Sequence, residues 1–393
     1  MTAVSDVVIV GAGIVGAACA RECASRGLST IVVDAAGTGS GATAAGMGHI
    51  VVMDDSPMQL ALTVYSQRLW RELSAELPGD VEFEPCGTLW VAADDEEMDE
   101  VRSKRSLYAT VGVDSEILDS QALTEAEPRL RRPLSGALLV SSDAVLYPPC
   151  AAGYLMREAV RMGAQLLAPQ RVLSAGKGRV LLENGTELHA ARIVNACGVD
   201  AARLLPGLPI RKRRGHLVIT DRYPGFVRHQ LVELGYLKSA HSLTADSVAF
   251  NVQPRRTGQL LIGSSREYGA ENSGVNHALL AAMVARAQAY LPEIGELQAT
   301  RIWTGFRAAT PDKLPLIGPW PEDGTLFLAT GHEGLGITTA LATAKLLVST
   351  MLGEQAEIPV EPYLPARYLH GEGDAEFAAG ASSKQIDTEK SHV

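Results

Sequence analysis

The sequence has few cysteines and no arrangement of them that is typical of a metal or cluster site. Its five cysteines are Cys19, Cys23, Cys86, Cys150 and Cys197, and no C-x-x-C spacing occurs among them. We therefore expect no metal site and no iron–sulfur cluster within this chain. Cys19 and Cys23 lie four residues apart in a predicted helix, and we interpret them as small core residues that face a sheet.

The chain also lacks an excess of positive charge. Its 35 lysines and arginines stand against 45 acidic residues, which gives a formal net charge of −10. This balance argues against nucleic acid or an anionic membrane as the main partner, because both require clustered positive charge. The basic run Arg211–Arg214 is the exception. A solvated or interdomain charged stretch is favoured there over a phosphate-binding patch.

Long apolar runs are missing as well. No uninterrupted stretch reaches the roughly 18 residues of a membrane span, and no basic segment precedes the first apolar stretch. We expect a cytoplasmic protein with reduced thiols and no membrane span, although an electron acceptor could hold it at the periphery of the inner membrane. With 393 residues, 46% of them hydrophobic, the chain is long enough for two globular domains.

The N-terminal sequence predicts a β-strand, a helix and a second β-strand. Residues 7–10 form a continuous run of valine and isoleucine, which is typical of a strand buried on both faces of a parallel sheet. Glycines follow at positions 11, 13 and 16, then a helical stretch to Arg26 and an apolar strand at 30–33 that ends at Asp34. This βαβ unit predicts an α/β fold.

The three glycines have the spacing and the context of a dinucleotide-binding fingerprint. Gly11 permits a tight turn, Gly13 lets backbone N–H groups approach a pyrophosphate, and Gly16 lets helix and strand pack closely. Asp34 stands 18 residues after Gly16, where a carboxylate can accept hydrogen bonds from ribose hydroxyls. The fingerprint does not separate NAD from FAD. A second mononucleotide half does not follow soon after the first, which favours FAD.

The rest of the sequence predicts both helices and strands. We expect helices at 57–77, 94–106 and 276–291, strands at 166–172, 180–182, 192–194 and 325–330, antiparallel strands at 246–253 and 259–265, a hairpin turn at 183–186, a Gly- and Pro-rich loop at 305–324, and a final helix entered through 331–336. The predicted nucleotide-binding domain comprises 1–56, 141–212 and 301–369. The predicted substrate domain comprises 57–140 and 213–300, and 370–393 is predicted to be a disordered tail.

Five motifs occur in the order found in the D-amino-acid oxidase-like flavoproteins. They are the fingerprint, Val194–Gly198, Gly263–Glu267, Gly305–Gly318 and Gly331–Gly336. The chain resembles this family, which includes glycine oxidase, sarcosine oxidase and the proline and hydroxyproline dehydrogenases, over residues 5–365. The stretch Gly48–Asp55 and the Gly331 motif are most similar to the catalytic FAD subunits of D-hydroxyproline dehydrogenase, opine oxidase and hydrogen cyanide synthase.

The resemblance implies a Rossmann-like FAD-binding domain of the glutathione-reductase type, with an inserted α+β substrate domain built on an antiparallel sheet. It implies non-covalent FAD, because no cysteine stands beside Arg307 as in sarcosine oxidases. The helix that follows Gly331 supplies N–H donors suited to the negative charge of a reduced flavin. The implied FAD-binding residues are Gly11, Gly13, Ile14, Val15, Gly16, Asp34, Ala35, Thr43, Ala44, Ala45, Gly46, Met47, Gly48, Val172, Ala196, Cys197, Gly198, Gly305, Gly331, His332, Gly334, Leu335, Gly336, Ile337 and Thr338.

Four residues are implied for the reaction itself. Arg307 matches the arginine with which the family holds the substrate carboxylate, and the alternative is a structural ion pair between Arg307 and Asp312. His49 and His332 are candidate flavin-facing histidines, with a satisfied buried histidine as the alternative for each. Tyr236 could close over the substrate or pack on the sheet.

The implied reaction is FAD-dependent oxidation of the Cα–N bond of a small amino or imino acid. Hydride passes to flavin N5, an imine forms, and D-hydroxyproline or D-proline is the first candidate substrate. The alternatives are a flavin-dependent hydroxy-acid or glycerol-phosphate dehydrogenase, an NAD-dependent dehydrogenase and a non-catalytic nucleotide-holding subunit. Sister subunits that carry iron–sulfur or further flavin centres are implied as partners.

Overall fold

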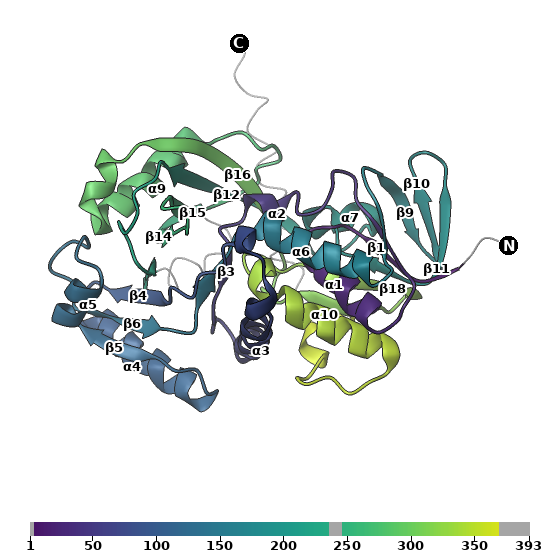
Figure 1. Cartoon of the computed structure of the whole chain (residues 1–393), viewed down its shortest axis with the longest axis horizontal. Helices are drawn as coiled ribbons and strands as arrows, with labels where there is room; N and C mark the ends of the chain where they lie inside the picture. The colour runs from purple at the N-terminus through teal and green to yellow at the C-terminus, as the bar shows by residue number, and fades with distance from the viewer. Residues whose placement is uncertain (1–3, 236–245, 369–393) are drawn as a thin grey trace, which may run out of the picture.

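Two large sheets lie side by side in the computed structural model, which describes residues 4–235 and 246–368 (Figure 1). The first sheet has the order β17-β18-β11-β1-β2-β8, and β9 and β10 extend it from β11. Its strands are β1 (Ser5–Val10), β2 (Thr30–Val33), β8 (Gln165–Leu167), β9 (Val172–Gly176), β10 (Arg179–Leu182), β11 (Glu187–Asn195), β17 (Leu316–Trp320) and β18 (Asp323–Thr330).

The centre of this first sheet is parallel, since β1 pairs in that sense with both β2 and β11. Val7 to Val10 are buried, as expected for a strand covered on both faces. Its main helices are α1 (Ile14–Ser25), α6 (Pro148–Arg161) and α10 (Gly336–Leu352), and α3 (Pro57–Leu73) packs on α10. Cys19 and Cys23 are buried in the α1 core, which confirms their predicted packing role.

The second sheet is almost entirely antiparallel and has the order β16-β12-β15-β14-β13-β4-β6-β5. Its strands are β4 (Thr88–Ala92), β5 (Glu116–Asp119), β6 (Gly136–Val140), β12 (Arg211–Thr220), β13 (Gln230–Glu233), β14 (Ser247–Pro254), β15 (Leu260–Tyr268) and β16 (Ala299–Ala309). Helix α9 (His277–Tyr290) covers β14 and β15, and α4 (Asp95–Thr110) and α5 (Ser120–Ala126) pack at the other end.

The remaining α-helices and β-strands of the described residues are short. They are α2 (Ala42–Ala45), β3 (His49–Ile50), β7 (Ala144–Val145) and α7 (Ala201–Leu204). β3 pairs with β7 and lies between the two large sheets (Figure 1). This architecture confirms the predicted fold class, a Rossmann-like α/β part combined with an antiparallel-sheet part.

Two predicted elements are wrong. The loop predicted at 305–324 instead contains the end of β16 and all of β17, because residues 305–309 pair with β12 and residues 316–320 with β18. The strand predicted at 166–172 is interrupted between β8 and β9, where Pro169 has no backbone N–H to donate.

The predicted domain division stays a prediction, although its boundary at residue 301 lies inside β16. The predicted tail at 370–393 lies outside the described residues. Within the described ranges, no helix is long and apolar enough to cross a membrane, and no group of three or more potential ligand residues could hold a metal ion. The cytoplasmic location stays a prediction.

Candidate active site

The fingerprint glycines have the geometry that the sequence predicts. Gly11 directly follows β1 and has a φ of +108°, a conformation that favours glycine. A β-carbon at Gly11 would lie 2.5 Å from the carbonyl oxygen of Ala196, and one at Gly16 would lie 1.9 Å from the carbonyl oxygen of Gly11. Strand β1 and helix α1 therefore pack closely because both positions lack a side chain.

The start of α1 and the end of β2 form the next part of the site. Gly13 is the N-cap of α1, and the backbone N–H of Ile14 donates to Oγ1 of Thr43 at 3.0 Å. The Asp34 carboxylate accepts hydrogen bonds from the N–H groups of Ala12 at 2.7 Å and Gly37 at 2.7 Å. Asp34 thus ties the fingerprint loop to β2, and its contact with a ribose stays a prediction.

The glycine-rich stretch after β2 is held between the two sheets. A β-carbon at Gly46 would lie 2.6 Å from Cδ1 of Ile337, at the start of α10. Nε2 of Gln253, on β14, donates to the carbonyl of Met47 at 2.8 Å. Oγ1 of Thr338 donates to the carbonyl of His49 at 2.8 Å. These contacts bring the predicted FAD-binding segments 43–48 and 331–338 together.

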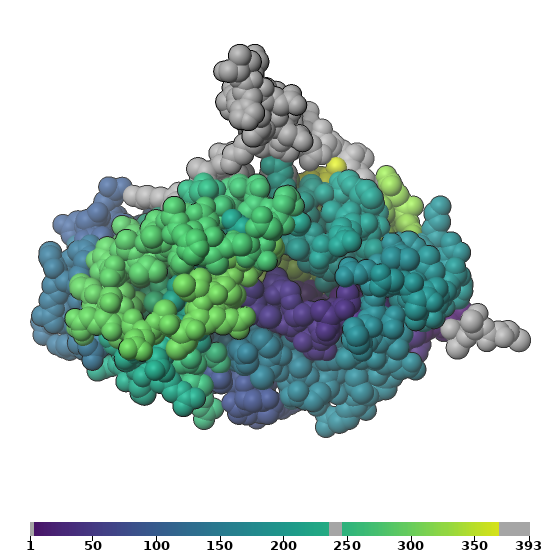
Figure 2. Space-filling model, turned by 90° about the horizontal axis from the view of Figure 1, so that it is seen from above, coloured from purple at the N-terminus to yellow at the C-terminus, as the bar shows by residue number. Residues whose placement is uncertain are grey.

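A cavity with about 900 Å³ of empty space, part of it open to solvent, lies where these segments meet the antiparallel sheet. In Figure 2, purple atoms of the N-terminal part are visible between the green and the teal parts of the molecule. The cavity is lined by Ile14, Ala42, Ala45, Gly46, Met47, Gly48, His49, Gly215, Leu217, Asn251, Ser264, Gly305, Phe306, Arg307, Glu333, Gly334, Gly336 and Ile337.

Arg307 enters this cavity from β16. Its guanidinium lies over Gly215 of the neighbouring β12, and Nη1 donates to the carbonyl of Ser265 at 3.0 Å. Asp312, the partner in the alternative interpretation, pairs with Arg367 at 2.7 Å. Arg307 thus lines the cavity together with the predicted flavin-binding segments, and its contact with a substrate stays a prediction.

Glu333 is a charged cavity residue that the sequence analysis did not name. It has a φ of +49°, and its N–H donates to the carbonyl of Ala308 at 2.9 Å. Nη1 of Arg213 donates to Oε1 of Glu333 at 2.5 Å. Burial would raise the pKa of Glu333, but the charges of Arg213, Arg266 and Arg307 hold it at about 2. Glu333 is therefore a carboxylate that sits among three guanidinium groups.

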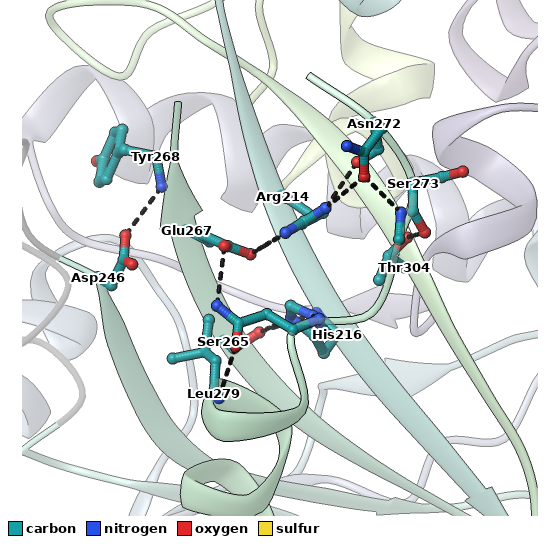
Figure 3. A network of polar contacts seen from close by, with 12 residues as sticks. Arg214, His216, Asp246, Ser265, Glu267, Tyr268, Asn272, Ser273, Leu279 and Thr304 are labelled. Atoms are coloured by element: carbon teal, nitrogen blue, oxygen red, sulfur yellow. Dashed lines mark hydrogen bonds and ion pairs between the residues drawn. The ribbon is translucent and has the colours of Figure 1, made fainter. Parts of the chain in front are cut away.

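The basic run 211–214 divides between the two faces of the antiparallel sheet. Arg213 and Arg214 are 1% and 7% exposed, so the expectation of a solvated stretch is wrong for both. Since side chains alternate along a strand, Arg213 and Arg214 point to opposite faces. Arg213 meets Glu333 on the cavity side, and Arg214 pairs with Glu267 at 2.8 Å beside the segment that leads into α9 (Figure 3). The Arg213–Glu333 pair connects β12 to the segment that precedes α10.

A sequence model of the FAD dependent oxidoreductase family, DAO, matches residues 6–350. The chain belongs to this family. It is 27% identical over 414 residues to the hydrogen cyanide synthase subunit HcnC of Pseudomonas aeruginosa, with 92% of this chain and 96% of that protein covered.

Two solved structures have the same fold as this chain. Glycine oxidase from Geobacillus kaustophilus has a TM-score of 0.82 at 25% identity and covers 94% of this chain and 100% of its own. L-Proline dehydrogenase from P. horikoshii has a TM-score of 0.83 at 24% identity, with 95% and 100% covered. The protein is thus a FAD-dependent oxidoreductase, as predicted.

The residues present fit FAD. Gly13, the half-buried N-cap of α1, carries no side chain that would cover the N-terminus of that helix, and the cavity joins Gly46 and Gly48 to the start of α10. Of the other predicted cofactor residues, Ala196 packs against Gly11, and Sγ of Cys197 lies 3.3 Å from the carbonyl oxygen of Val10. The residues that line the cavity do not include the predicted cofactor residues Val15, Ala35, Ala44, Val172, Gly198, Gly331, Leu335 and Thr338.

The two candidate histidines have different surroundings. His49 lines the cavity, burial lowers its pKa to about 4, and its Nε2 has no hydrogen-bond partner within the described part of the chain. His332 does not line the cavity; its Nε2 lies 3.0 Å from Oγ1 of Thr343, and burial lowers its pKa to about 3. This position favours the satisfied buried histidine for His332. Tyr236 lies outside the described residues.

Sequence reasoning missed Glu333, Arg213 and Asn251. Glu333 lies within the quoted Gly331–Gly336 motif, and alternation along the basic run would have separated Arg213 from Arg214 once a strand was assigned there. Asn251 carries no local signal, because a single polar residue within a predicted strand does not indicate a ligand contact.

Proposed function

We propose that this flavoprotein oxidises the Cα–N bond of a small amino or imino acid to an imine. The observation that carries the proposal is the Arg307 guanidinium in a cavity that the predicted flavin-binding segments also line. A guanidinium presents a planar set of donors that matches a carboxylate. The relatives named as glycine oxidase and L-proline dehydrogenase support an amino-acid substrate.

In this proposal Arg307 binds the substrate carboxylate and thereby selects which face of Cα is presented. The carbonyl of Ser265 accepts a hydrogen bond from Nη1 and so helps to orient the guanidinium in the cavity. His49, uncharged near neutral pH, adds no second positive charge beside Arg307. Bound FAD would supply the acceptor for the hydride of Cα at N5. Orientation by Arg307 accounts for much of the effect.

D-Hydroxyproline or D-proline is the proposed first substrate, and this finer choice is supported by the sequence resemblance alone. The test is anaerobic bleaching of the flavin absorbance by a panel of compounds. The panel includes D-hydroxyproline, D- and L-proline, glycine and sarcosine, with lactate and glycerol 3-phosphate for the competing substrate classes. Bleaching by hydroxy acids and not by any amine would overturn the proposal.

The matched variants are Arg307→Ala and, as a control, Arg129→Ala at a surface ion pair with Glu293. We expect Arg307→Ala to raise KM by about 100-fold or more with unchanged FAD content, because one charged, bidentate contact is lost. The control should retain the wild-type KM. An unchanged KM in Arg307→Ala contradicts the assigned role.

We further propose that the electrons leave through a sister subunit that carries iron–sulfur or further flavin centres. The relative HcnC is named as a subunit of hydrogen cyanide synthase, which supports this arrangement. Purification from the native source, together with comparison of dye reduction and peroxide formation, tests it. Rapid peroxide formation by the isolated chain would favour an oxidase that needs no partner.

A further inference from the structure

Asn251 is a buried polar residue of the cavity whose side chain is not explained by the packing around it. It lies on β14, is 6% exposed and lines the cavity. Its Oδ1 atom has no hydrogen-bond partner among the residues that the structure describes. Buried polar atoms are usually paired, because an unpaired acceptor loses its bond to water without replacement. A carboxamide offers both an acceptor and donors, so either orientation leaves a group for a ligand.

The strand order places Asn251 near the group that holds the substrate carboxylate. From β16, Arg307 reaches over Gly215 on β12, and its Nη1 meets the carbonyl of Ser265 on β15. β14 is the next strand, and Asn251 pairs with Gly263, two residues along β15 from Ser265. The Asn251 and Ser265 backbones are separated by one inter-strand spacing across the sheet and by two residues along the strand, which together give roughly 8 Å. Asn251 and Arg307 both line the cavity, so a small amino acid bound there can meet both side chains.

We propose that Asn251 is a specificity-determining residue that accepts a hydrogen bond from the substrate's amine N–H while Arg307 holds the carboxylate. This inference rests on the proposed function and names the substrates that the cavity prefers. They are α-amino or α-imino acids whose reacting nitrogen keeps at least one hydrogen. His49 lines the same cavity and also has a buried nitrogen without a partner among the described residues, so the amine side of the cavity is polar.

The chemistry makes this hydrogen bond stronger as the reaction proceeds. FAD, when bound, would accept the hydrogen of Cα with the electron pair of the broken Cα–H bond, as hydride. The nitrogen lone pair then forms the second bond of C=N. Positive charge develops on nitrogen, so its remaining N–H becomes a better donor to Oδ1 of Asn251. An interaction that strengthens in the transition state raises kcat as well as binding.

The test compares two substrates in two proteins. The substrates are the best primary or secondary amino acid found in the panel and its fully N-alkylated tertiary analogue, which has no N–H in its neutral form. In Asn251→Leu we expect kcat/KM for the N–H substrate to fall by about 10- to 100-fold, the effect of one lost hydrogen bond to a buried acceptor. For the tertiary analogue we expect less than a threefold change, since that contact is not made.

Two controls separate recognition from folding. A carboxylic acid without the amine should inhibit Asn251→Leu and wild type with the same inhibition constant, because Arg307 is intact in both. Asn251→Asp keeps an acceptor of the same size, so it should retain most activity. Its negative charge should move the acid limb of the kcat/KM profile to higher pH by holding the substrate's ammonium form. If Asn251→Leu does not fold, the shift of the kcat/KM profile in Asn251→Asp tests the role of Asn251 instead.

The outcomes distinguish this inference from the proposed function. If the wild-type protein oxidises no amine, the proposed function fails. If it does, but Asn251→Leu lowers kcat/KM equally for both substrates or for neither, the role of Asn251 is overturned while the function stands. An unshifted profile in Asn251→Asp also counts against it.

Discussion

The guanidinium of Arg307 lies directly over Gly215 of the adjacent strand, where a β-carbon would be 2.6 Å from Nη1. Gly215 pairs with Gly305 on β16, and a β-carbon at Gly305 would in turn lie 2.4 Å from Cβ of Ala45. Two opposed glycines thus make room, one for Arg307 and the other for the predicted flavin segment. The position of Arg307 therefore depends on Gly215, a residue that has no side chain with which to contact a ligand.

Gly215→Ala should therefore impair substrate binding while the protein remains folded. The methyl group would displace the flexible end of Arg307, and a misplacement of about 1 Å can cost roughly 100-fold in rate. We expect kcat/KM to fall by about 10- to 100-fold with normal FAD content, measured by steady-state kinetics. Gly324→Ala, on β18 with open space around the added carbon, is the matched control. Equal activity of the two variants would show that Arg307 does not depend on Gly215.

Gly16→Ala and Gly13→Ala should separate folding from cofactor binding. A β-carbon at Gly16 meets the Gly11 carbonyl at 1.9 Å, whereas one at Gly13 meets only Oγ1 of Thr43 at 3.3 Å. We expect Gly16→Ala to lose about 1–3 kcal/mol of stability or more, since backbone must move. Gly13→Ala should keep the fold and bind FAD more weakly. Thermal unfolding and flavin content measure both effects, and wild-type stability of Gly16→Ala would contradict the packing role.

Stability should fall as the pH drops below about 6.5, in part because of His332. Burial lowers its folded-state pKa from 6.5 to about 3, so the unfolded chain takes up a proton that the folded protein excludes. The stability from this group is complete above pH 6.5 and is lost towards pH 3, with a slope of at most about 1.4 kcal/mol per pH unit. The free energy of unfolding of His332→Gln, measured by denaturant titration from pH 7 to 5, should depend less on pH. Parallel curves for His332→Gln and the wild-type protein would refute the prediction.

Asp143 should contribute the opposite dependence of stability on pH, and Asp143→Asn should remove it. Burial raises the pKa of Asp143 to about 7, although hydrogen bonds from Gln67 and from the N–H of Val52 lower it. The folded protein therefore retains a proton that the unfolded chain releases near pH 4, and stability is lost as the pH rises towards 7. Asparagine keeps an oxygen that can accept both hydrogen bonds.

The variant should accordingly gain stability over wild type between pH 5 and 8. We expect a difference on the order of 1 kcal/mol or more at pH 8, from denaturant titrations at each pH. Asp143→Ala, which also removes the acceptor for Gln67 and Val52, should be less stable than wild type at pH 5. A difference between Asp143→Asn and wild type that stays constant with pH would contradict a buried, titrating carboxyl.

Local chemistry explains which elements could be predicted. The strand at 7–10, the glycines that follow it and Asp34 lie within one continuous segment, so their spacing alone indicates a dinucleotide fold. β16 could not be predicted in the same way. Its residues 305–309 resemble a loop because of their glycine and neighbouring prolines, and they form a strand only because β12, almost a hundred residues earlier, supplies the hydrogen bonds.

The sequence alone determined the α/β architecture, the family and FAD, because ordered glycine motifs constrain the backbone wherever they occur. The tertiary structure decided the site. It turned His49 towards the cavity and His332 into the core, and it paired Asp312 with Arg367 so that Arg307 meets the cavity. It also brought Glu333 against Arg213. These side-chain positions depend on which face of a strand or helix packs against a segment that is distant in the sequence. A local sequence pattern does not contain that information.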